Sequence, residues 1–219
     1  MTRASRNICT YAIVPVKESP AAKTRLAEAL SNRDRASLSQ SMLSDVLDVL
    51  CGTKEIRRIV LVTHGVNAAR LGARKGACVL SEGHARGLNP AVRRGIRFAE
   101  REGADQVLIV PADVPLTKSA DLRRILRIGR STSALIVPSH DGGGTNALLL
   151  RPPRILPVSY GSNSFKRHCK LARNRNLKIR ILRSKGLGLD VDLPSDMTRV
   201  RLESGNTKSQ RFLRKRFAP

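Results

Sequence analysis

Short runs of Val, Ile and Leu alternate along this chain with segments whose apolar residues recur at helical spacing. The clearest apolar runs are 11–16, 59–62, 107–110, 135–137 and 147–150. Runs this apolar are typical of strands buried on both faces, as in parallel sheets covered by helices. The alternation therefore predicts an α/β fold: a single domain with a mostly parallel, Rossmann-like sheet and helices on both faces.

The first long helix has recognisable ends. Its apolar residues from Leu38 to Leu50 form one face, Ser31 is the expected N-cap, and Gly52 is the expected end. A later helix is expected to start at Asn89-Pro90, with the asparagine as cap and the proline in the first turn. Further helices are expected at 67–75, 120–128 and 164–172, and further strands at 77–80, 179–182 and 189–191.

The chain is strongly basic, with 41 Lys and Arg against 17 Asp and Glu among 219 residues, a formal net charge of +24. Such a charge favours polyanionic partners: nucleic acid, acidic lipid or a phosphate-rich substrate. Aromatic residues make up only 3%, which argues against a single-strand binder that stacks bases. We expect a folded domain at 1–205 and a mobile or loosely helical basic tail at 206–219, where no acidic residue occurs.

The cysteines and the apolar runs bear on the compartment. Cys9, Cys51, Cys78 and Cys169 are spaced too widely for a zinc knuckle or a redox pair, so we expect reduced thiols. No apolar run approaches the roughly 20 residues that span a bilayer, and the N-terminus lacks the pattern of a signal peptide. These features predict a cytoplasmic protein.

Charged residues follow several of the predicted strands. Lys17, Lys23 and Arg25 follow the first strand, Asp113 follows 107–110, and two carboxylates flank the late segment 190–192. Ligands of open α/β sheets collect at the carboxyl ends of strands. The basic set could neutralise a triphosphate and the acidic set could hold a divalent cation, which together suit a reaction at phosphorus.

Each of these features also has a plain structural interpretation. A basic cluster is usually a solvated face, and an aspartate after a strand can be a turn residue. Asp190 and Asp192 share one side of an extended segment, however, and two like charges there are costly without a cation. The chain has no Gly-x-x-x-x-Gly-Lys-Ser/Thr loop and no Gly-x-Gly-x-x-Gly after the first strand. His64, His84, His140 and His168 have no metal spacing, and we expect them to be surface or packing residues.

Six motifs in order resemble one enzyme family. They are 12–17 with 22–26, Gly87-Leu88-Asn89, 111–116, 144–148, Tyr160-Gly161 with Ser164-Phe165 and His168, and 189–194. Over roughly residues 10 to 200 the chain resembles the guanylyltransferases of coenzyme F-420 biosynthesis, which act on 2-phospho-L-lactate or phosphoenolpyruvate. Ser162-Asn163 stands where these relatives often have Pro-Gly.

The resemblance implies a fold similar to the nucleotide-diphospho-sugar and molybdopterin nucleotidyltransferases. It implies transfer of GMP from GTP to a phosphorylated three-carbon acid, with release of pyrophosphate. By matching position, Mg²⁺ would be held by Asp113, Asp190 and Asp192, and the acceptor would be bound by Thr145, Gly161 and Ser164. The nucleotide would be faced by Lys17, Lys23, Arg25 and Asn89. The catalytic residues would be Asp113, Lys23 and Arg25.

Several alternatives stay open at this point. Phosphoenolpyruvate is the favoured acceptor, with 2-phospho-L-lactate and 3-phospho-D-glycerate as alternatives. A molybdopterin nucleotidyltransferase is a second reading, although those relatives usually have a Gly-Gly loop after the first strand and 17–22 has no glycine. A basic nucleic-acid-binding protein is a third interpretation. Non-specific binding of nucleic acid is expected whichever interpretation holds. The downstream deazaflavin transferase is a candidate partner, no membrane is expected, and a homodimer is left open.

Overall fold

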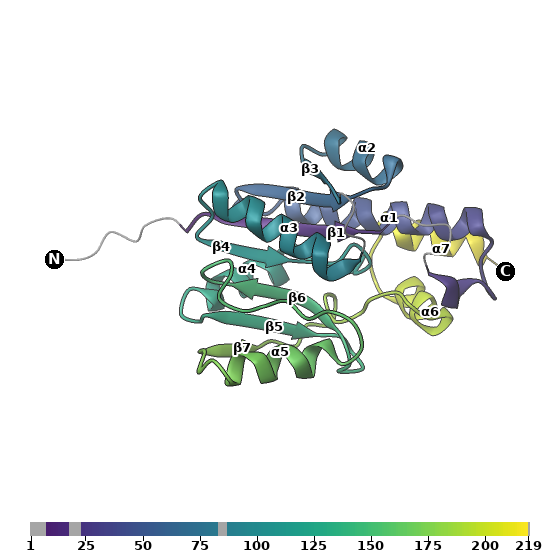
Figure 1. Cartoon of the computed structure of the whole chain (residues 1–219). Coiled ribbons are helices and arrows are strands. Elements are labelled where there is room, and N and C mark those ends of the chain that lie inside the picture. The colour runs from purple at the N-terminus through teal and green to yellow at the C-terminus, as the bar shows by residue number, and fades with distance from the viewer. Residues whose placement is uncertain (1–7, 18–22, 83–86, 219) are drawn as a thin grey trace.

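The computed structural model describes residues 8–17, 23–82 and 87–218. Its strands and helices alternate as the sequence predicts (Figure 1). The strands are β1 (Thr10–Val16), β2 (Arg58–Thr63), β3 (Cys78–Ser81), β4 (Gln106–Ile109), β5 (Ala134–Pro138), β6 (Thr145–Leu150) and β7 (Ile179–Ile181). The helices are η1, a 3-10 turn (Thr24–Leu26), α1 (Asn32–Cys51), α2 (Val66–Arg74), α3 (Leu88–Arg101), α4 (Ser119–Gly129), α5 (Ser164–Arg173), α6 (Pro194–Leu202) and α7 (Lys208–Arg216).

The seven strands form one sheet in the order β3-β2-β1-β4-β6-β5-β7. Strand β6 runs antiparallel to both of its neighbours, β4 and β5, and the other pairs are parallel. The predicted α/β fold with a mostly parallel sheet is therefore confirmed. Because β6 is reversed, its first residue, Thr145, lies at the same edge as the carboxyl ends of β1 and β4.

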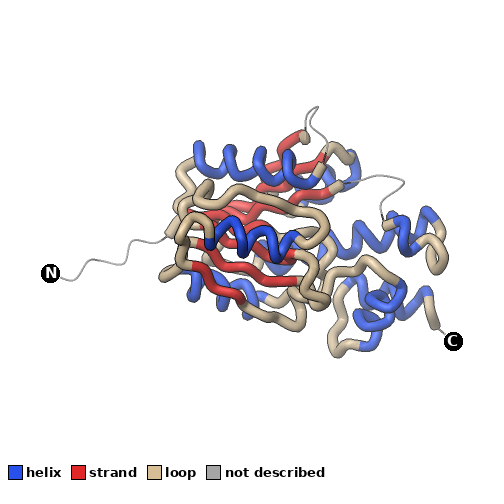
Figure 2. Tube along the Cα trace, turned by 60° about the horizontal axis from the view of Figure 1, so that its bottom comes forward, coloured by secondary structure: helices blue, strands red, loops and turns tan. Residues whose placement is uncertain are grey.

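Helices cover both faces of the sheet (Figure 2). Helices α1, α2 and α4 pack on one face, where Ala12 and Val14 of β1 point. Helices α3 and α5 pack on the other, where Tyr11 and Ile13 point. Strand β1 is thus buried on both sides, which is why it reads as an unbroken apolar run.

A third apolar cluster lies beyond the carboxyl edge of the sheet, where α6 and α7 pack beside the start of α1 (Figure 1). It holds Leu38 and Met42 of α1, Val200 of α6 and Leu213 of α7, together with Leu26 of η1. This cluster closes one side of the region into which the strand ends open.

The C-terminal segment, for which the sequence predicted a mobile or loosely helical tail, contains helix α7, which packs against α1 and α6. Thr207 caps α7 by accepting a hydrogen bond from the Gln210 amide, and Leu213 is fully buried. The buried carboxylate of Asp45 in α1 accepts hydrogen bonds from the amides of Lys208 and Ser209. Most basic residues of α7 are exposed, but Lys208 Nζ donates to Ser44 and Asp48 of α1, and Arg216 Nε donates to Asp34 of α1.

Two local predictions also need correction. Helix α3 begins at Leu88 after Gly87, so Asn89 lies inside the first turn and is not the cap. Residues 189–191 do not form a strand of the sheet; instead the Val191 amide donates one hydrogen bond to the carbonyl of Asp113.

The four cysteines are free, as expected. Among the described residues, no helix is long and apolar enough to cross a membrane.

Candidate active site

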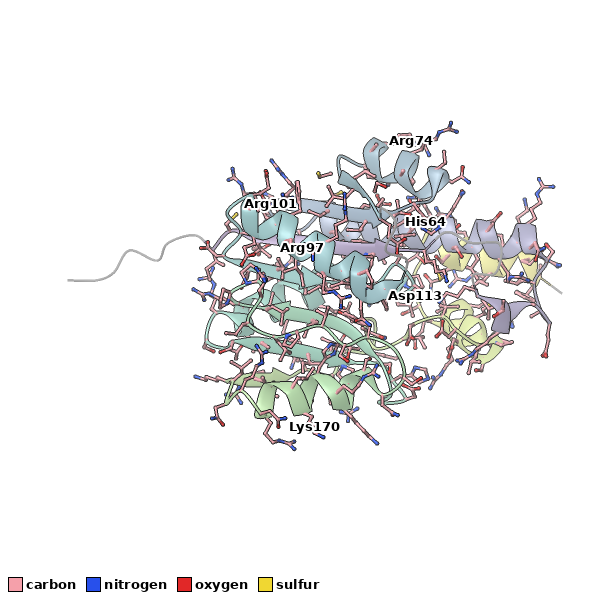
Figure 3. All side chains as sticks on the ribbon, viewed as in Figure 1. His64, Arg74, Arg97, Arg101, Asp113 and Lys170 are labelled. Atoms are coloured by element: carbon pink, nitrogen blue, oxygen red, sulfur yellow. The ribbon has the colours of Figure 1, made fainter. Side chains whose placement is uncertain are left out.

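A lysine joins two of the predicted aspartates at the carboxyl edge of the sheet. The Lys23 ammonium donates to Asp113 Oδ2 at 2.5 Å and to Asp192 Oδ1 at 2.6 Å. The Lys23 side chain is 14% exposed, against 27% for Asp113 and 48% for Asp192. Figure 3 shows Asp113 at this edge, away from Arg97 and Arg101 on α3 and Lys170 on α5. One member of the predicted basic set therefore meets two members of the predicted acidic set at one point.

The backbone explains how segments distant in the sequence reach this point. Asp113 follows β4, and the hydrogen bond from the Val191 amide to its carbonyl lays 190–192 alongside it. Lys23 precedes η1 with a left-handed φ of 55°, a conformation that is uncommon for a residue with a Cβ. Such strained residues concentrate at functional sites.

The charges at this edge are only partly balanced. Burial lowers the pKa of Lys23, but the carboxylates of Asp113 and Asp192 outweigh it and raise that pKa overall. Burial raises the pKa of Asp190, as do the neighbouring charges of Asp113 and Asp192, while a hydrogen bond from Asn146 opposes this rise. A further cation would relieve the repulsion around Asp190.

The three aspartates do not form a ready-made metal site. Asp190 Oδ1 is held by the Asn146 side-chain amide at 3.0 Å, and Lys23 occupies the place between the other two. Among residues 8–17, 23–82 and 87–218, no group of three carboxylate, thiol or imidazole side chains is placed to hold a metal ion. The hard oxygen donors and the unrelieved charge of Asp190 nevertheless fit Mg²⁺, which needs few protein ligands.

A cavity of ≈ 460 Å³ opens beside this cluster. It lies between the end of β1, α1 and α3, so that apolar walls adjoin the charged groups. Its lining includes Lys17, Lys23, Arg25, Met42, Glu82, Leu88, Asp113 and Asp192. A larger cavity, of ≈ 1070 Å³, lies at the opposite, amino edge of the sheet; ligands of this class of fold do not bind there, and we assign the smaller one as the site.

The predicted acceptor residues gather on the α5 side of the same edge. Thr145 Oγ1 lies 3.3 Å from Ser164 Oγ and 3.0 Å from His168 Nδ1, and all three residues are buried. Gly161 has a φ of +113°, and a Cβ there would lie 3.1 Å from the Arg167 guanidinium. Asn163, where relatives often have glycine, takes a left-handed φ of 56°, which asparagine tolerates better than most residues.

Asn89 contacts the acceptor side of the edge. Its side-chain amide donates to the carbonyl of Tyr160 at 3.0 Å, and its Oδ1 accepts from the Tyr160 amide at 2.7 Å. Both ends of the side chain therefore hold the backbone next to Gly161. Asn89 is not among the described residues that line the cavity beside Lys23, and its place facing the nucleotide stays a prediction.

Sequence reasoning missed two polar residues here, Asn146 and Glu82, and did not predict the contacts of His168. Asn146 follows Thr145 on β6, where the pairing with β5 is irregular, and its side-chain amide holds Asp190; this pairing depends on which segments meet in space. Buried Glu82 accepts from the Gly87 amide and pairs with His64, and no local pattern signals it. His168 was expected to be a packing or surface residue, and it is fully buried with both ring nitrogens bonded. His84 lies outside the described residues.

Comparison with known proteins settles the family. The model of the CofC-like guanylyl transferases matches residues 10–218. The chain belongs to this family. The match extends through α7, so the resemblance does not stop near residue 200 as the motifs alone suggested. The family consists of nucleotidyltransferases, which confirms the enzyme class expected from the motifs.

Two relatives illustrate the range of the family. The chain is 39% identical over 197 residues to the phosphoenolpyruvate guanylyltransferase of Rubrobacter xylanophilus, covering 89% of this chain and 95% of the relative. It is 34% identical over 206 residues to the 2-phospho-L-lactate guanylyltransferase of Methanothermobacter thermautotrophicus, covering 94% and 90%.

Solved structures confirm the fold. A structure from Desulfovibrio desulfuricans assigned to the nucleotide-diphospho-sugar transferases has a TM-score of 0.78 at 20% identity, covering 94% of each chain. Rv0371c from Mycobacterium tuberculosis, solved as a manganese complex, has a TM-score of 0.56 at 22% identity, covering 88% of this chain and 97% of that one. A divalent metal thus binds at least one protein with this fold.

Proposed function

We propose that this chain transfers GMP from GTP to phosphoenolpyruvate, releasing pyrophosphate, as a step of coenzyme F-420 biosynthesis. The observation that carries the proposal is the meeting of Lys23 with Asp113 and Asp192 at the strand ends, beside the hydroxyl cluster of Thr145 and Ser164. The cavity lined by Lys17, Lys23 and Arg25 supports a nucleoside triphosphate as one ligand, and the two hydroxyls at the same sheet edge support a phospho-acid as the other.

The geometry supports a role for each group in this proposal. An oxygen of the acceptor phosphate attacks the α-phosphorus of GTP, the bond from that phosphorus to the bridging β-oxygen breaks, and pyrophosphate carries the electron pair away. Lys17, Lys23 and Arg25 line the cavity and offset the negative charge of the triphosphate in the transition state. Asp113, Asp190 and Asp192 would hold Mg²⁺, which when bound would polarise the phosphate oxygens and neutralise part of their charge.

Thr145, Gly161 and Ser164 bind the acceptor in this proposal. The two hydroxyls offer polar contacts to an acid, and Gly161 keeps the backbone accessible because it has no Cβ. Phosphoenolpyruvate is favoured because the relatives of that name are 36–39% identical to this chain, against 29–34% for those named for 2-phospho-L-lactate.

The acceptor is tested by pyrophosphate release, measured as the inorganic phosphate that pyrophosphatase forms from it. Purified protein is given GTP, Mg²⁺ and one of phosphoenolpyruvate, 2-phospho-L-lactate or 3-phospho-D-glycerate, with pyrophosphatase to pull the equilibrium. We expect the highest kcat/KM with phosphoenolpyruvate. A higher value with either other acid would overturn the acceptor assignment, and salt-sensitive nucleic-acid binding without turnover would favour the alternative of a nucleic-acid-binding protein.

Ser164→Val tests the acceptor subsite. The variant replaces a buried hydroxyl with a bulkier apolar group, so we expect the KM for the phospho-acid to rise about tenfold or more while that for GTP changes less than about twofold. Steady-state kinetics with each substrate varied in turn gives both values. If only the KM for GTP rose, the hydroxyl cluster would belong to the nucleotide.

Asn89→Ala separates the two roles considered for Asn89. Loss of its two hydrogen bonds to Tyr160 frees the backbone beside Gly161, so we expect the KM for the phospho-acid to rise about tenfold. The same kinetics report the KM for GTP. A rise in that value alone would restore the nucleotide role that the resemblance implies.

A further inference from the structure

A buried histidine beside the acceptor subsite has no part in the function proposed above. His168 lies on α5, four residues after Ser164, and none of its surface is exposed. Its Nδ1 lies 3.0 Å from Thr145 Oγ1, and its Nε2 lies 2.9 Å from the Ser159 amide nitrogen. Because burying an imidazole is costly unless its nitrogens are bonded, these two contacts decide what the ring can do.

The contacts determine where the ring proton sits. A backbone amide can only donate, so His168 Nε2 must accept from Ser159 and carry no proton. The proton of the neutral ring is therefore on Nδ1, which donates to Thr145 Oγ1. Burial, together with the nearby Arg167, lowers the pKa of His168 to about 4, so the ring is neutral at pH 7.

This tautomer constrains the Thr145 hydroxyl. A hydroxyl has two acceptor lone pairs and one proton to donate. Thr145 Oγ1 accepts from His168 and lies 3.3 Å from the Ser164 hydroxyl, which donates to it. With both lone pairs taken, the Thr145 proton is left for a third partner, which in the proposed function is the acceptor acid.

Neighbouring groups fix the ring in place. The ring of Tyr160 meets that of His168 edge to face, with centroids 5.1 Å apart and planes at 76°. The Tyr160 backbone is held in turn by Asn89 and by the Arg167 guanidinium. The imidazole therefore has little freedom to turn away from Thr145.

We propose that His168 is a positioning residue that directs the Thr145 hydroxyl proton toward the acceptor acid. The proposal rests on the proposed function, since it assumes that Thr145 binds a phospho-acid. His168 does not touch the substrate; its donation fills a lone pair of Thr145 and so makes Thr145 a committed donor to an anionic oxygen. Hydrogen bonds to charged groups are the stronger ones, so this orientation should matter most for acceptor binding.

A double-mutant cycle tests the proposal. His168→Met fills similar space without donors, Thr145→Val removes the hydroxyl, and the double variant carries both changes. We expect His168→Met to raise the KM for phosphoenolpyruvate about tenfold in the wild-type background, and less than about twofold when Thr145→Val is already present. The KM for GTP should change less than about twofold throughout.

His168→Asn is the conservative variant, because its side-chain amide places a donor near the position of Nδ1. We expect it to recover most of the acceptor affinity and to supply the comparison if His168→Met does not fold. Three results would make the role merely structural and overturn the proposal. His168→Met could raise the KM for phosphoenolpyruvate equally with and without Thr145→Val, or it could raise the KM values for GTP and phosphoenolpyruvate equally. The third result is a His168→Asn variant that recovers no acceptor affinity. Absence of turnover in the wild-type protein would instead overturn the proposed function.

Discussion

Asp113→Asn is expected to lower kcat by about 10²-fold or more, a loss of several kcal/mol of transition-state stabilisation. Asp113 follows β4 and contacts Lys23, which also contacts Asp192. An amide keeps the size of the side chain but removes the negative charge that a divalent cation requires. The measurement is kcat for GTP and phosphoenolpyruvate across a Mg²⁺ titration, with thermal melting alongside.

Asp105→Asn is the matched control for this experiment. Asp105 immediately precedes β4, at the opposite end of the sheet, and its carboxylate accepts from the Cys9 amide, a bond that asparagine can keep. We expect its kcat to stay within about twofold of wild type. The Asp113 variant should still fold, because Lys23 keeps Asp192 as a partner. Near-wild-type turnover of Asp113→Asn at limiting Mg²⁺ would contradict the metal assignment.

Removal of residues 206–219 is expected to destabilise the protein by more than about 3 kcal/mol, which corresponds to a fall in Tm of about 10 °C. The truncation uncovers the apolar cluster that Leu213 fills. It also leaves the buried Asp45 carboxylate without the two amides and the Ser209 hydroxyl that donate to it, and an unpaired buried charge is costly. Thermal or urea unfolding of the truncated chain measures the loss.

Two single substitutions accompany the truncation. Leu213→Ala keeps the helix and removes part of its buried contact, so we expect a loss of about 2–5 kcal/mol. Lys215→Ala removes a charge from the exposed side of the same helix and should change stability by less than about 0.5 kcal/mol. A truncated chain that melted at the wild-type temperature would mean that α7 is not part of the folded domain.

The sheet and most helices could be predicted from the sequence because burial on both faces leaves a direct signature. The runs that became β1, β2 and β4 are apolar without interruption, and Ser31 accepts from the Asp34 amide as an N-cap should. The segment 189–191 misled the prediction, since Leu189 and Val191 are buried in the third cluster rather than in the sheet. The docking of helix α7 was not predicted because charge dominates its sequence, whereas its contacts depend on a few residues such as Leu213 and Ser209.

The site was predictable where strand order alone decides it. Asp113 and Lys23 follow central strands, so they had to reach one edge of the sheet. The pairing of Asn89 with Tyr160 and of Asn146 with Asp190 depends on which loops meet in space, and no local sequence pattern encodes that. The sequence also did not predict that Lys23 would bridge two of the aspartates, Asp113 and Asp192.

The central claim, transfer of the guanylyl group, is tested most directly by following the phosphorus atoms of GTP. The protein is incubated with phosphoenolpyruvate, Mg²⁺ and pyrophosphatase, and with GTP labelled with ³²P at either the α- or the γ-phosphate. We predict that the α-label appears in a guanosine diphospho-acid that forms only when the acceptor is present, and that the γ-label appears in inorganic phosphate. The same incubation is repeated with 2-phospho-L-lactate and 3-phospho-D-glycerate. The claim would be contradicted if, with all three phospho-acids, the α-label stayed in GTP or appeared in GMP or GDP regardless of acceptor.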